Sequence, residues 1–336
     1  MRMSTPFTKT VVFYIVPDFT MLAFTSAIEA LRLANAVHGK EAYRWRIVSV
    51  DGLPVTSSCG LTITPHGPIA SEMAKPHADN ADMVVVCAGW HVERAVNRSA
   101  AAWLRRARNA GTTIAGVCTG AYLLAHAGLL AGRRCTIHWE NLPVFKETFP
   151  AAIAGTNLIE CDANLYTCAG GAASFDLMLH FIEHEFGRRT SLAVCEQAII
   201  DRIRLPSERQ RSLVRTLGNL NPLLLAAVEF MEDGMADASI EAVARHIKLS
   251  RRQMERIFAK ELATSPSRFY LELRLDRARL MILQSGMAIV DVAVACGFVS
   301  SSHFTKCYRE HYGVSPNKMR LMRPRSAQLQ SHASVS

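Results

Sequence analysis

The chain has 336 residues, more than the roughly 250–300 that one hydrophobic core usually holds, so its length predicts two domains. Apolar residues make up 49% of the sequence, and the formal net charge of +9 indicates a polyanionic partner. The sequence begins without the apolar stretch of a signal peptide, and its nine cysteines form an odd set without a CxxC pair. We therefore expect a cytoplasmic protein with reduced thiols and without metal or cofactor.

The first two hundred residues alternate short β-branched runs with amphipathic runs of helical period. This alternation is typical of a parallel sheet covered by helices on both faces, so we predict an α/β domain, a flavodoxin-like parallel-sheet sandwich. The predicted strands are residues 10–15, 45–50, 83–86, 113–117, 135–137 and 165–167. The predicted helices are residues 22–35, 99–109, 121–127, 141–149, 174–186 and 191–202.

A cysteine, Cys118, stands between the fourth predicted strand and the helix that follows it, with Gly116 and Gly120 two residues away on either side. Residues 114–132 are uncharged, but their glycines break the stretch, so we expect a buried strand, turn and helix and no contact with a membrane. The glycine spacing predicts a nucleophile elbow beside the amides of a helix N-terminus. The surrounding residues, GVCTGAYLLAHAGLLAGRRCTIHW, resemble the class I glutamine amidotransferase-like superfamily, and the resemblance runs over about residues 11–186.

Two groups that would activate the thiol are missing. Thr119 follows the cysteine where PfpI-type enzymes of this superfamily have a histidine, and Ala23 stands where its members keep a carboxylate. Asp18 is the nearest remaining carboxylate, and His138 either approaches Cys118 or has a structural role. We expect a vestigial elbow and no catalytic residue, because two of the groups that would activate the thiol are missing. A Cys118-dependent hydrolase or deglycase is the alternative.

A pocket that has lost its catalytic groups can still bind a small molecule. Trp90 and Trp139 would form an aromatic wall for an ammonium group, and the helix amides after Cys118 would receive a carboxylate; in the alternative, the tryptophans are core residues. By analogy with the superfamily, the candidate ligand-binding residues are Asp18, Phe19, Gly89, Trp90, Cys118, Thr119, His138, Trp139 and Gly170.

One further motif lies in the predicted helix 174–186. His180, Glu183 and His184 fit H-x-x-E-H, the zinc motif of inverted zinc peptidases. The same residues form the polar side of a helix whose apolar residues face the sheet, so we interpret them as a solvated helix face.

The domain boundary is predicted from composition. Residues 1–205 are predicted to form an amidotransferase-like domain for ligand sensing and dimerisation. Residues 221–325 are predicted to form an all-α domain, and residues 206–220 a linker between the two. Residues 326–336 form a polar tail that we expect to be disordered. The basic excess lies late in the chain, since residues 222–336 carry 16 Lys and Arg against 11 Asp and Glu.

The predicted all-α domain contains an internal repeat. Each copy consists of a short helix, a turn of about four residues and a second helix, which is the geometry of a helix-turn-helix. Ile240, Val243 and Ala244 recur 49 residues later as Ile289, Val292 and Ala293, and Met254 and Phe258 recur 50 residues later as Phe304 and Tyr308.

The second helix of each copy has a polar face opposite its apolar stripe. Such residues hydrogen-bond to base edges and phosphates, although a lone basic face is more often simply solvated. Two copies can place two helices in successive major grooves, about 34 Å apart, which favours DNA binding. The candidate DNA-binding residues are Ser250, Arg251, Arg252, Gln253, Glu255, Arg256, Lys260, Ser300, Ser301, Ser302, His303, Thr305, Lys306 and Arg309.

Residues 222–322 resemble the DNA-binding domain of the AraC family, and AVACGFVSSSHFTKCYREHYGVSP is especially similar to the family signature. Fused to an amidotransferase-like domain, this arrangement resembles the GlxA-type transcription regulators. The resemblance implies a homodimeric regulator, expected to be an activator, that binds double-stranded promoter DNA and responds to a small nitrogen-containing effector such as a betaine, carnitine or an amino acid. RNA polymerase is a further candidate partner, and an architectural DNA-binding protein is the alternative.

Overall fold

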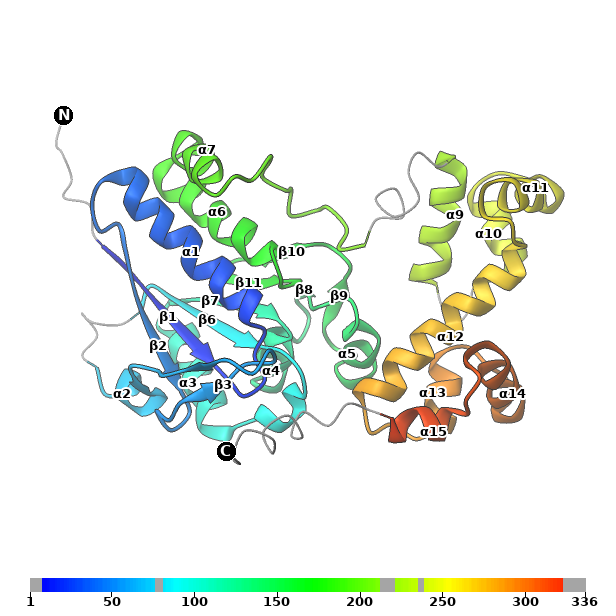
Figure 1. The fold of residues 1–336 in the computed structure, drawn as a ribbon, viewed down its shortest axis with the longest axis horizontal. Coiled ribbons are helices and arrows are strands. Elements are labelled where there is room, and N and C mark those ends of the chain that lie inside the picture. Colours follow the sequence, from blue (N-terminus) through cyan, green and yellow to red (C-terminus); the bar gives the residue numbers. More distant parts are fainter. Residues whose placement is uncertain (1–7, 76–80, 212–220, 235–238, 323–336) are drawn as a thin grey trace, which may run out of the picture. The chain divides into compact units, whose positions relative to one another are not determined.

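The computed structural model describes residues 8–75, 81–211, 221–234 and 239–322. The chain divides into two compact units, Met1–Gln210 and Arg211–Ser336, which are called here the N-terminal domain and the C-terminal domain (Figure 1). The predicted positions 212–220 of the linker, and the predicted tail, lie outside the described residues.

The N-terminal domain is built on a seven-stranded sheet with the order β10-β11-β7-β6-β1-β2-β5. All neighbouring strands are parallel except β10, which runs antiparallel to β11. The strands are β1 (Lys9–Ile15), β2 (Tyr43–Ser49), β5 (Gly67–Pro68), β6 (Met83–Ala88), β7 (Thr113–Cys118), β10 (Ile159–Asp162) and β11 (Leu165–Cys168). Every residue of β6 is buried, as a parallel strand covered on both faces requires.

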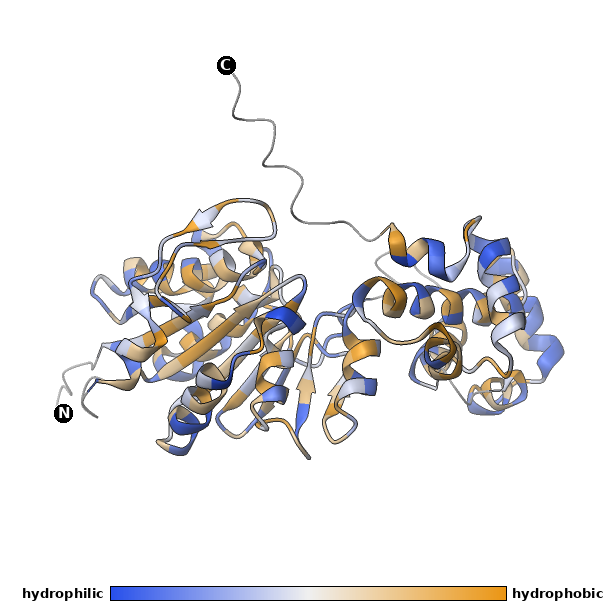
Figure 2. Ribbon diagram, turned by 90° about the horizontal axis from the view of Figure 1, so that it is seen from below, coloured by the Kyte–Doolittle hydropathy of each residue, from blue (hydrophilic) through white to orange (hydrophobic). Residues whose placement is uncertain are grey.

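Helices cover both faces of this sheet, and alternate residues of β1 enter the two layers. Phe13 packs with α1 (Met21–His38), α6 (Ala173–Phe186) and α7 (Arg188–Gln197), whereas Tyr14 packs with α3 (Arg98–Asn109), α4 (Gly120–His126) and α5 (Leu142–Thr148) (Figure 1). Figure 2 shows hydrophobic residues along the strands and mixed residues along the helices. The predicted flavodoxin-like sandwich is thus confirmed. The remaining short elements of this domain are α2 (Ile69–Met73), the 3-10 helix η2 (Val92–Ala95), the β3–β4 pair (Val55–Thr56 and Thr62–Ile63) and the β8–β9 pair (Arg134–Thr136 and Ile153–Gly155).

Three parts of the N-terminal domain differ from the sequence-based prediction. The predicted strand 135–137 corresponds to β8, which pairs with β9 outside the main sheet. The predicted helix 191–202 is shifted, since α7 begins at Arg188 and ends at Gln197, before the exposed Ile199 with its positive φ. Residues 206–210, predicted as linker, pair with this domain: Ile159 N donates to Pro206 O at 3.1 Å, and Leu158 N donates to Glu208 O at 2.7 Å.

The C-terminal domain is helical throughout its described residues. Its helices are α9 (Pro222–Asp233), α10 (Ile240–His246), α11 (Arg251–Leu262), α12 (Pro266–Gln284), α13 (Ile289–Ala295), α14 (Ser301–Tyr312) and α15 (Pro316–Leu321). The pairs α10–α11 and α13–α14 are the two predicted helix-turn-helix units. The long helix α12 contacts α11 on one side and α13, α14 and α15 on the other, so it joins the two units.

Candidate functional site

The first candidate interface is the outward face of α11. The predicted capping box is present, since Ser250 Oγ accepts from Gln253 N at 3.3 Å and Gln253 Oε1 accepts from Ser250 N at 2.9 Å. Met254 and Phe258 are completely buried and fix the rotation of the helix. The capping box fixes where the helix begins, and the burial of Met254 and Phe258 leaves the opposite, polar face toward solvent.

The arginines of α11 differ in whether they already form ion pairs within the protein. Arg251 donates to Glu255 Oε1 at 3.0 Å and to Glu241 Oε1 at 2.9 Å, so its guanidinium is shared between two carboxylates. Arg252 and Arg256 are exposed and form no ion pair within the described part of the chain. These two arginines are therefore the cations of α11 that a phosphate or a base can meet without breaking an internal contact.

The second candidate interface is α14, which begins after Ser300, whose Oγ accepts from His303 N at 3.3 Å. Phe304 and Tyr308 form the buried side of this helix. His303 lies against the ring of Phe298, and its Nε2 is 3.3 Å from Cys307 Sγ. The predicted polar residues gather around a shallow hollow of about 330 Å³, lined by Ser301, Ser302, Thr305, Lys306 and Arg309.

A residue of helix α12 holds the turn of the second helix-turn-helix in place. Arg274 Nε donates to the carbonyl oxygen of Cys296 at 2.6 Å, and its guanidinium carbon lies 4.1 Å from the centre of the Phe298 ring. Burial lowers the pKa of Arg274, although a guanidinium remains charged at neutral pH. Because Cys296 and Phe298 flank the turn before α14, Arg274 connects the long helix directly to the start of α14.

The predicted elbow is present at the end of β7. Cys118 has a φ of 57°, in the left-handed region, and α4 begins two residues later at Gly120. Its side chain is nearly buried, with 6% exposure, and its Sγ lies 3.3 Å from Thr20 Oγ1. Burial raises the pKa of the Cys118 thiol, and the contact with the Thr20 hydroxyl offsets this only in part. The elbow therefore holds a protonated thiol.

Two glycines allow backbone segments to meet at the elbow. A Cβ on Gly170, which has a φ of +86°, would lie 2.5 Å from Cα of Cys118. A Cβ on Gly89 would lie 2.1 Å from the carbonyl oxygen of Asp18. These predicted ligand residues thus have a structural role that only glycine fulfils.

The side chains of two other predicted ligand residues are buried inside the domain. Phe19 has no exposed surface and packs edge-on against Phe24 in the core, so its ring shapes the domain instead of facing a ligand. Thr119 is buried, and its hydroxyl donates to the carbonyl oxygen of Gly89 at 2.7 Å. Both side chains are therefore committed to internal contacts.

The remaining candidates are more accessible. Trp90 is 54% exposed, and its backbone N–H donates to the carbonyl oxygen of Asp18. His138 N donates to the carbonyl oxygen of Cys118 at 3.2 Å, and its ring lies 5.7 Å from that of Trp139. Burial lowers the pKa of His138, and nearby Glu140 opposes this shift.

Two residues near the elbow were not predicted from the sequence, Thr20 and His91. Thr20 contacts Cys118 although the two residues are 98 positions apart, and no local sequence pattern indicates such a contact. His91 Nδ1 lies 3.5 Å from the Asp18 carboxylate, and both residues have positive φ values.

In the H-x-x-E-H motif of α6, the Glu183 carboxylate accepts a hydrogen bond from the Ser191 hydroxyl and forms an ion pair with Arg188.

Alkylation with iodoacetamide at pH 7.5 is expected to modify Cys59 long before Cys118. Cys59 is exposed, and a hydrogen bond from Ser57 lowers its pKa, so more of it is thiolate at this pH; burial raises the pKa of Cys118 and keeps its thiol protonated. Mass spectrometry of timed digests measures both rates. Ser57→Ala should slow the modification of Cys59 alone. Modification of Cys118 first would contradict this account of the elbow.

Each of the two domains matches a known protein family. A family model described as the DJ-1/PfpI family matches residues 9–184, and one described as a helix-turn-helix domain matches residues 243–322. The chain belongs to the AraC-type transcription regulators with a DJ-1/PfpI domain. Both predicted resemblances are thereby confirmed.

Full-length relatives support the same assignment. The HTH-type transcriptional regulator GbdR of Pseudomonas aeruginosa is 42% identical over 314 residues, which cover 93% of this chain and 84% of GbdR. The HTH-type transcriptional regulator GlxA of Rhizobium meliloti is 32% identical over 311 residues, which cover 92% of this chain and 94% of GlxA. The GlxA-type architecture predicted from the sequence is therefore confirmed across both domains.

Among solved structures, an AraC family transcriptional regulator from Pseudomonas putida matches with a TM-score of 0.50 and 24% identity. The match covers 56% of this chain and 99% of the solved chain. Because the sequence identity is low, the match supports only the fold. Among the described helices, none combines the length and the hydrophobicity needed to cross a membrane.

Proposed function

We propose that this AraC-type regulator binds promoter DNA sequence-specifically and changes its binding in response to a small nitrogen-containing metabolite. The observation that carries the DNA-binding part is the duplicated arrangement of α11 and α14, each with a buried stripe and an exposed polar face. Helix α12, with 19 residues, spans about 28 Å, which is close to the rise of one turn of duplex, about 34 Å. This length supports the insertion of α11 and α14 into successive major grooves.

The roles of the candidate residues follow from their charge and exposure. Arg252, Arg256 and Lys306 would contact phosphates or guanine edges, and the hydroxyls around the hollow of α14 would contact base edges or phosphates. Arg251 would first have to exchange Glu241 or Glu255 for DNA. The proposed specificity therefore depends most on Arg256 and on the hollow of α14.

Arg256→Ala is expected to weaken operator binding by about 1–3 kcal/mol if Arg256 reads a base, and to relax specificity at that position. If Arg256 contacts a phosphate, binding to every sequence should weaken alike, and the salt dependence should become shallower by about one counterion. Fluorescence anisotropy over a salt series, with a selected operator and a random duplex, measures both effects. Arg32→Ala, an exposed arginine of α1 paired with Glu29, is the control. Unchanged binding to both duplexes would remove Arg256 from the proposed interface.

The effector is proposed to bind beside the elbow, against Trp90 and Trp139, with Asp18 and His138 as polar contacts. The exposure of Trp90 supports this placement, because an aromatic face favours a quaternary or primary ammonium group. Calorimetric titration of the full chain with betaine, carnitine and amino acids tests it. Saturable binding that Trp90→Ala weakens is the expected result, whereas no binding by any of these zwitterions would refute the effector assignment.

We further propose that the elbow is not catalytic. The buried Cys118 thiol and the committed Thr119 hydroxyl leave neither a nucleophile nor a base in an activated state. The protein would act in the cytoplasm as a homodimer joined through its N-terminal domain, and an activator of this kind would contact RNA polymerase. Light scattering at working concentration tests the dimer, and a strict monomer would contradict it.

A further inference from the structure

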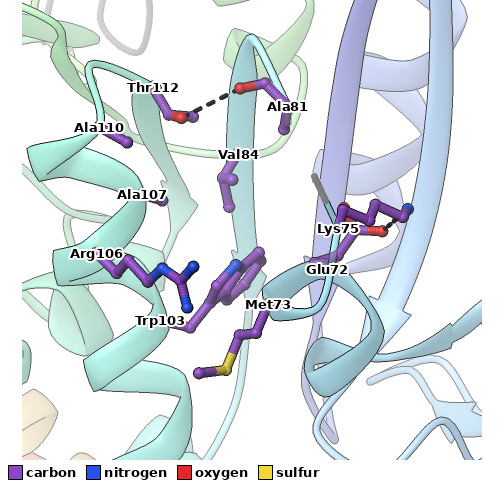
Figure 3. A pocket seen from close by; sticks show the side chains of 10 residues that line it. All are labelled: Glu72, Met73, Lys75, Ala81, Val84, Trp103, Arg106, Ala107, Ala110 and Thr112. Carbon is purple, nitrogen blue, oxygen red and sulfur yellow. Dashed lines mark hydrogen bonds and ion pairs between the residues drawn. The ribbon is translucent and has the colours of Figure 1, made fainter. Parts of the chain in front are cut away.

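A cavity of about 220 Å³ in the N-terminal domain is lined by residues that include members of α2, α3 and β6 (Figure 3). In its wall, the Glu72 carboxylate forms ion pairs with Lys75 and Arg46. The Thr112 hydroxyl donates to the carbonyl oxygen of Ala81 at 3.1 Å. These polar groups are satisfied within the protein and do not require a ligand.

The two helix-turn-helix units have the same backbone up to the middle of their turns. Lys248 and Gly297, 49 residues apart, both have a left-handed φ, of 56° and 73°. The next residues, Leu249 and Phe298, each donate their backbone N–H to the carbonyl oxygen of the residue five positions earlier, at 3.0 and 2.9 Å. Both side chains pack against apolar residues of their own unit. The offset of 49 residues therefore holds through Leu249 and Phe298.

The offset becomes 50 residues at the start of the second helices. Ser250 and Ser300 are the N-caps of α11 and α14, and each hydroxyl accepts from the backbone N–H three residues later. Ser250 directly follows Leu249, whereas Val299 stands between Phe298 and Ser300. Val299 is thus an additional residue of the second unit, and its side chain is completely exposed. Packing within the protein does not explain an aliphatic residue at this position.

The turn that carries Val299 is held in place by α12. Arg274 Nε donates to the carbonyl oxygen of Cys296, and its guanidinium lies over the ring of Phe298, the residue before Val299. Valine is β-branched and has few side-chain rotamers, so it loses little conformational entropy when it contacts a partner. The exposed isopropyl group is therefore presented in a defined position at the N-terminal end of α14.

The chemistry of Val299 restricts what it can contact in DNA. The N-terminal residues of the second helix of a helix-turn-helix contact base edges in the major groove. An isopropyl group cannot hydrogen-bond to a phosphate or to the polar atoms of a base. The C5-methyl group of thymine is the apolar group that a base pair presents in the major groove. Val299 lies two residues before Ser301, where the hollow of α14 begins, so it extends that polar surface by an apolar contact.

We propose that Val299 contacts the C5-methyl group of a thymine and so selects thymine at one position of the half-site bound by α14. This inference rests on the proposed insertion of α14 into a major groove. It adds to that interface a specificity residue that forms no hydrogen bond with the DNA. Cytosine at the same position would leave Val299 without the methyl group and beside the polar amino group of the base.

The test uses the full chain and an operator selected by the wild type from randomised duplexes. Each thymine of the operator is replaced singly by deoxyuridine, which lacks only the C5-methyl group. At one position this replacement should weaken binding in anisotropy titrations about fourfold, the effect of losing one buried methyl group. Val299→Ala, which removes both methyl groups of the side chain, should bind the thymine and deoxyuridine duplexes equally at that position. Its sensitivity at every other thymine should equal that of the wild type.

Val294→Ala is the matched control, because Val294 is also an exposed valine of the second unit but lies on α13. It should retain the wild-type affinities and the full effect of deoxyuridine, and thermal melting should show that both variants are folded. The role of Val299 is refuted if no deoxyuridine effect depends on it, or if Val294→Ala abolishes the same effect. A random duplex is titrated in parallel, so a wild type that does not prefer the operator would instead refute the proposed DNA recognition itself.

Discussion

Phe304→Ala is expected to unfold the second helix-turn-helix and to remove sequence-specific DNA binding. Phe304 is completely buried and packs edge-on against Phe298 and Tyr308, at 5.0 and 5.5 Å between ring centres. Truncating a buried phenylalanine costs about 3–5 kcal/mol, a large part of the stability of a small helical domain. Thermal unfolding followed by circular dichroism, together with anisotropy on a selected operator, measures both consequences.

Leu321→Ala is the control for this variant, because Leu321 ends α15 and is largely exposed. It should melt with the wild type and bind the operator normally. The N-terminal domain should keep its own melting transition in Phe304→Ala, since its two hydrophobic core clusters are made of residues of that domain alone. Normal operator affinity in a folded Phe304→Ala variant would show that α14 is not needed for recognition.

Gly170→Ala should destabilise the N-terminal domain by about 2–5 kcal/mol. A left-handed φ costs a non-glycine residue about 1–2 kcal/mol, and forcing a methyl group against backbone adds about 1–3 kcal/mol. The added carbon would meet the Cα of Cys118, which cannot move without distorting the elbow. The melting temperature of the full chain reports the loss, and about 2–4 °C are expected for each kcal/mol.

Gly171→Ala is the control that separates the cost of the left-handed φ from the cost of the close contact with Cys118. Gly171 also has a positive φ, but its Cβ would meet nothing closer than a Leu22 methyl at 3.9 Å, so only the conformational cost of about 1–2 kcal/mol applies. The difference between the variants therefore measures the close approach at the elbow. If the two variants melt together, the packing of Gly170 against Cys118 does not contribute to stability.

The elements that the sequence predicted well are those with a long, regular pattern. The β-branched run of β6 and the helical period of α6 extend over enough residues to be read without any tertiary information. The capping box of α11 is a local signal for the same reason, since Ser250 and Gln253 are three residues apart. The duplication in the C-terminal domain was visible because the same apolar positions recur.

The elements that were missed depend on contacts between distant segments. Two of the four residues of strand β10, Glu160 and Asp162, are charged, so the strand has no β-branched run that would predict it. Residues 206–210 were predicted as a linker because they are polar, and their hydrogen bonds with Leu158 and Ile159 cannot be inferred from composition. The hydrogen bond from the Thr119 hydroxyl to the carbonyl oxygen of Gly89 likewise joins residues distant in sequence, so no local pattern predicts it. In the turn before α14, Val299 is fully exposed, although an aliphatic residue is usually read as core.

The bond from Arg274 to the turn before α14 also bears on the DNA that the regulator can recognise. Since α12 is one continuous helix and Arg274 fixes that turn to it, the separation of α11 and α14, the two helices proposed to contact DNA, is set by protein geometry and has little room to adjust. Promoters should therefore tolerate changes of base within a half-site far better than a changed number of bases between half-sites. Inserting about half a helical repeat would turn the second site to the opposite side of the duplex, out of reach of α14.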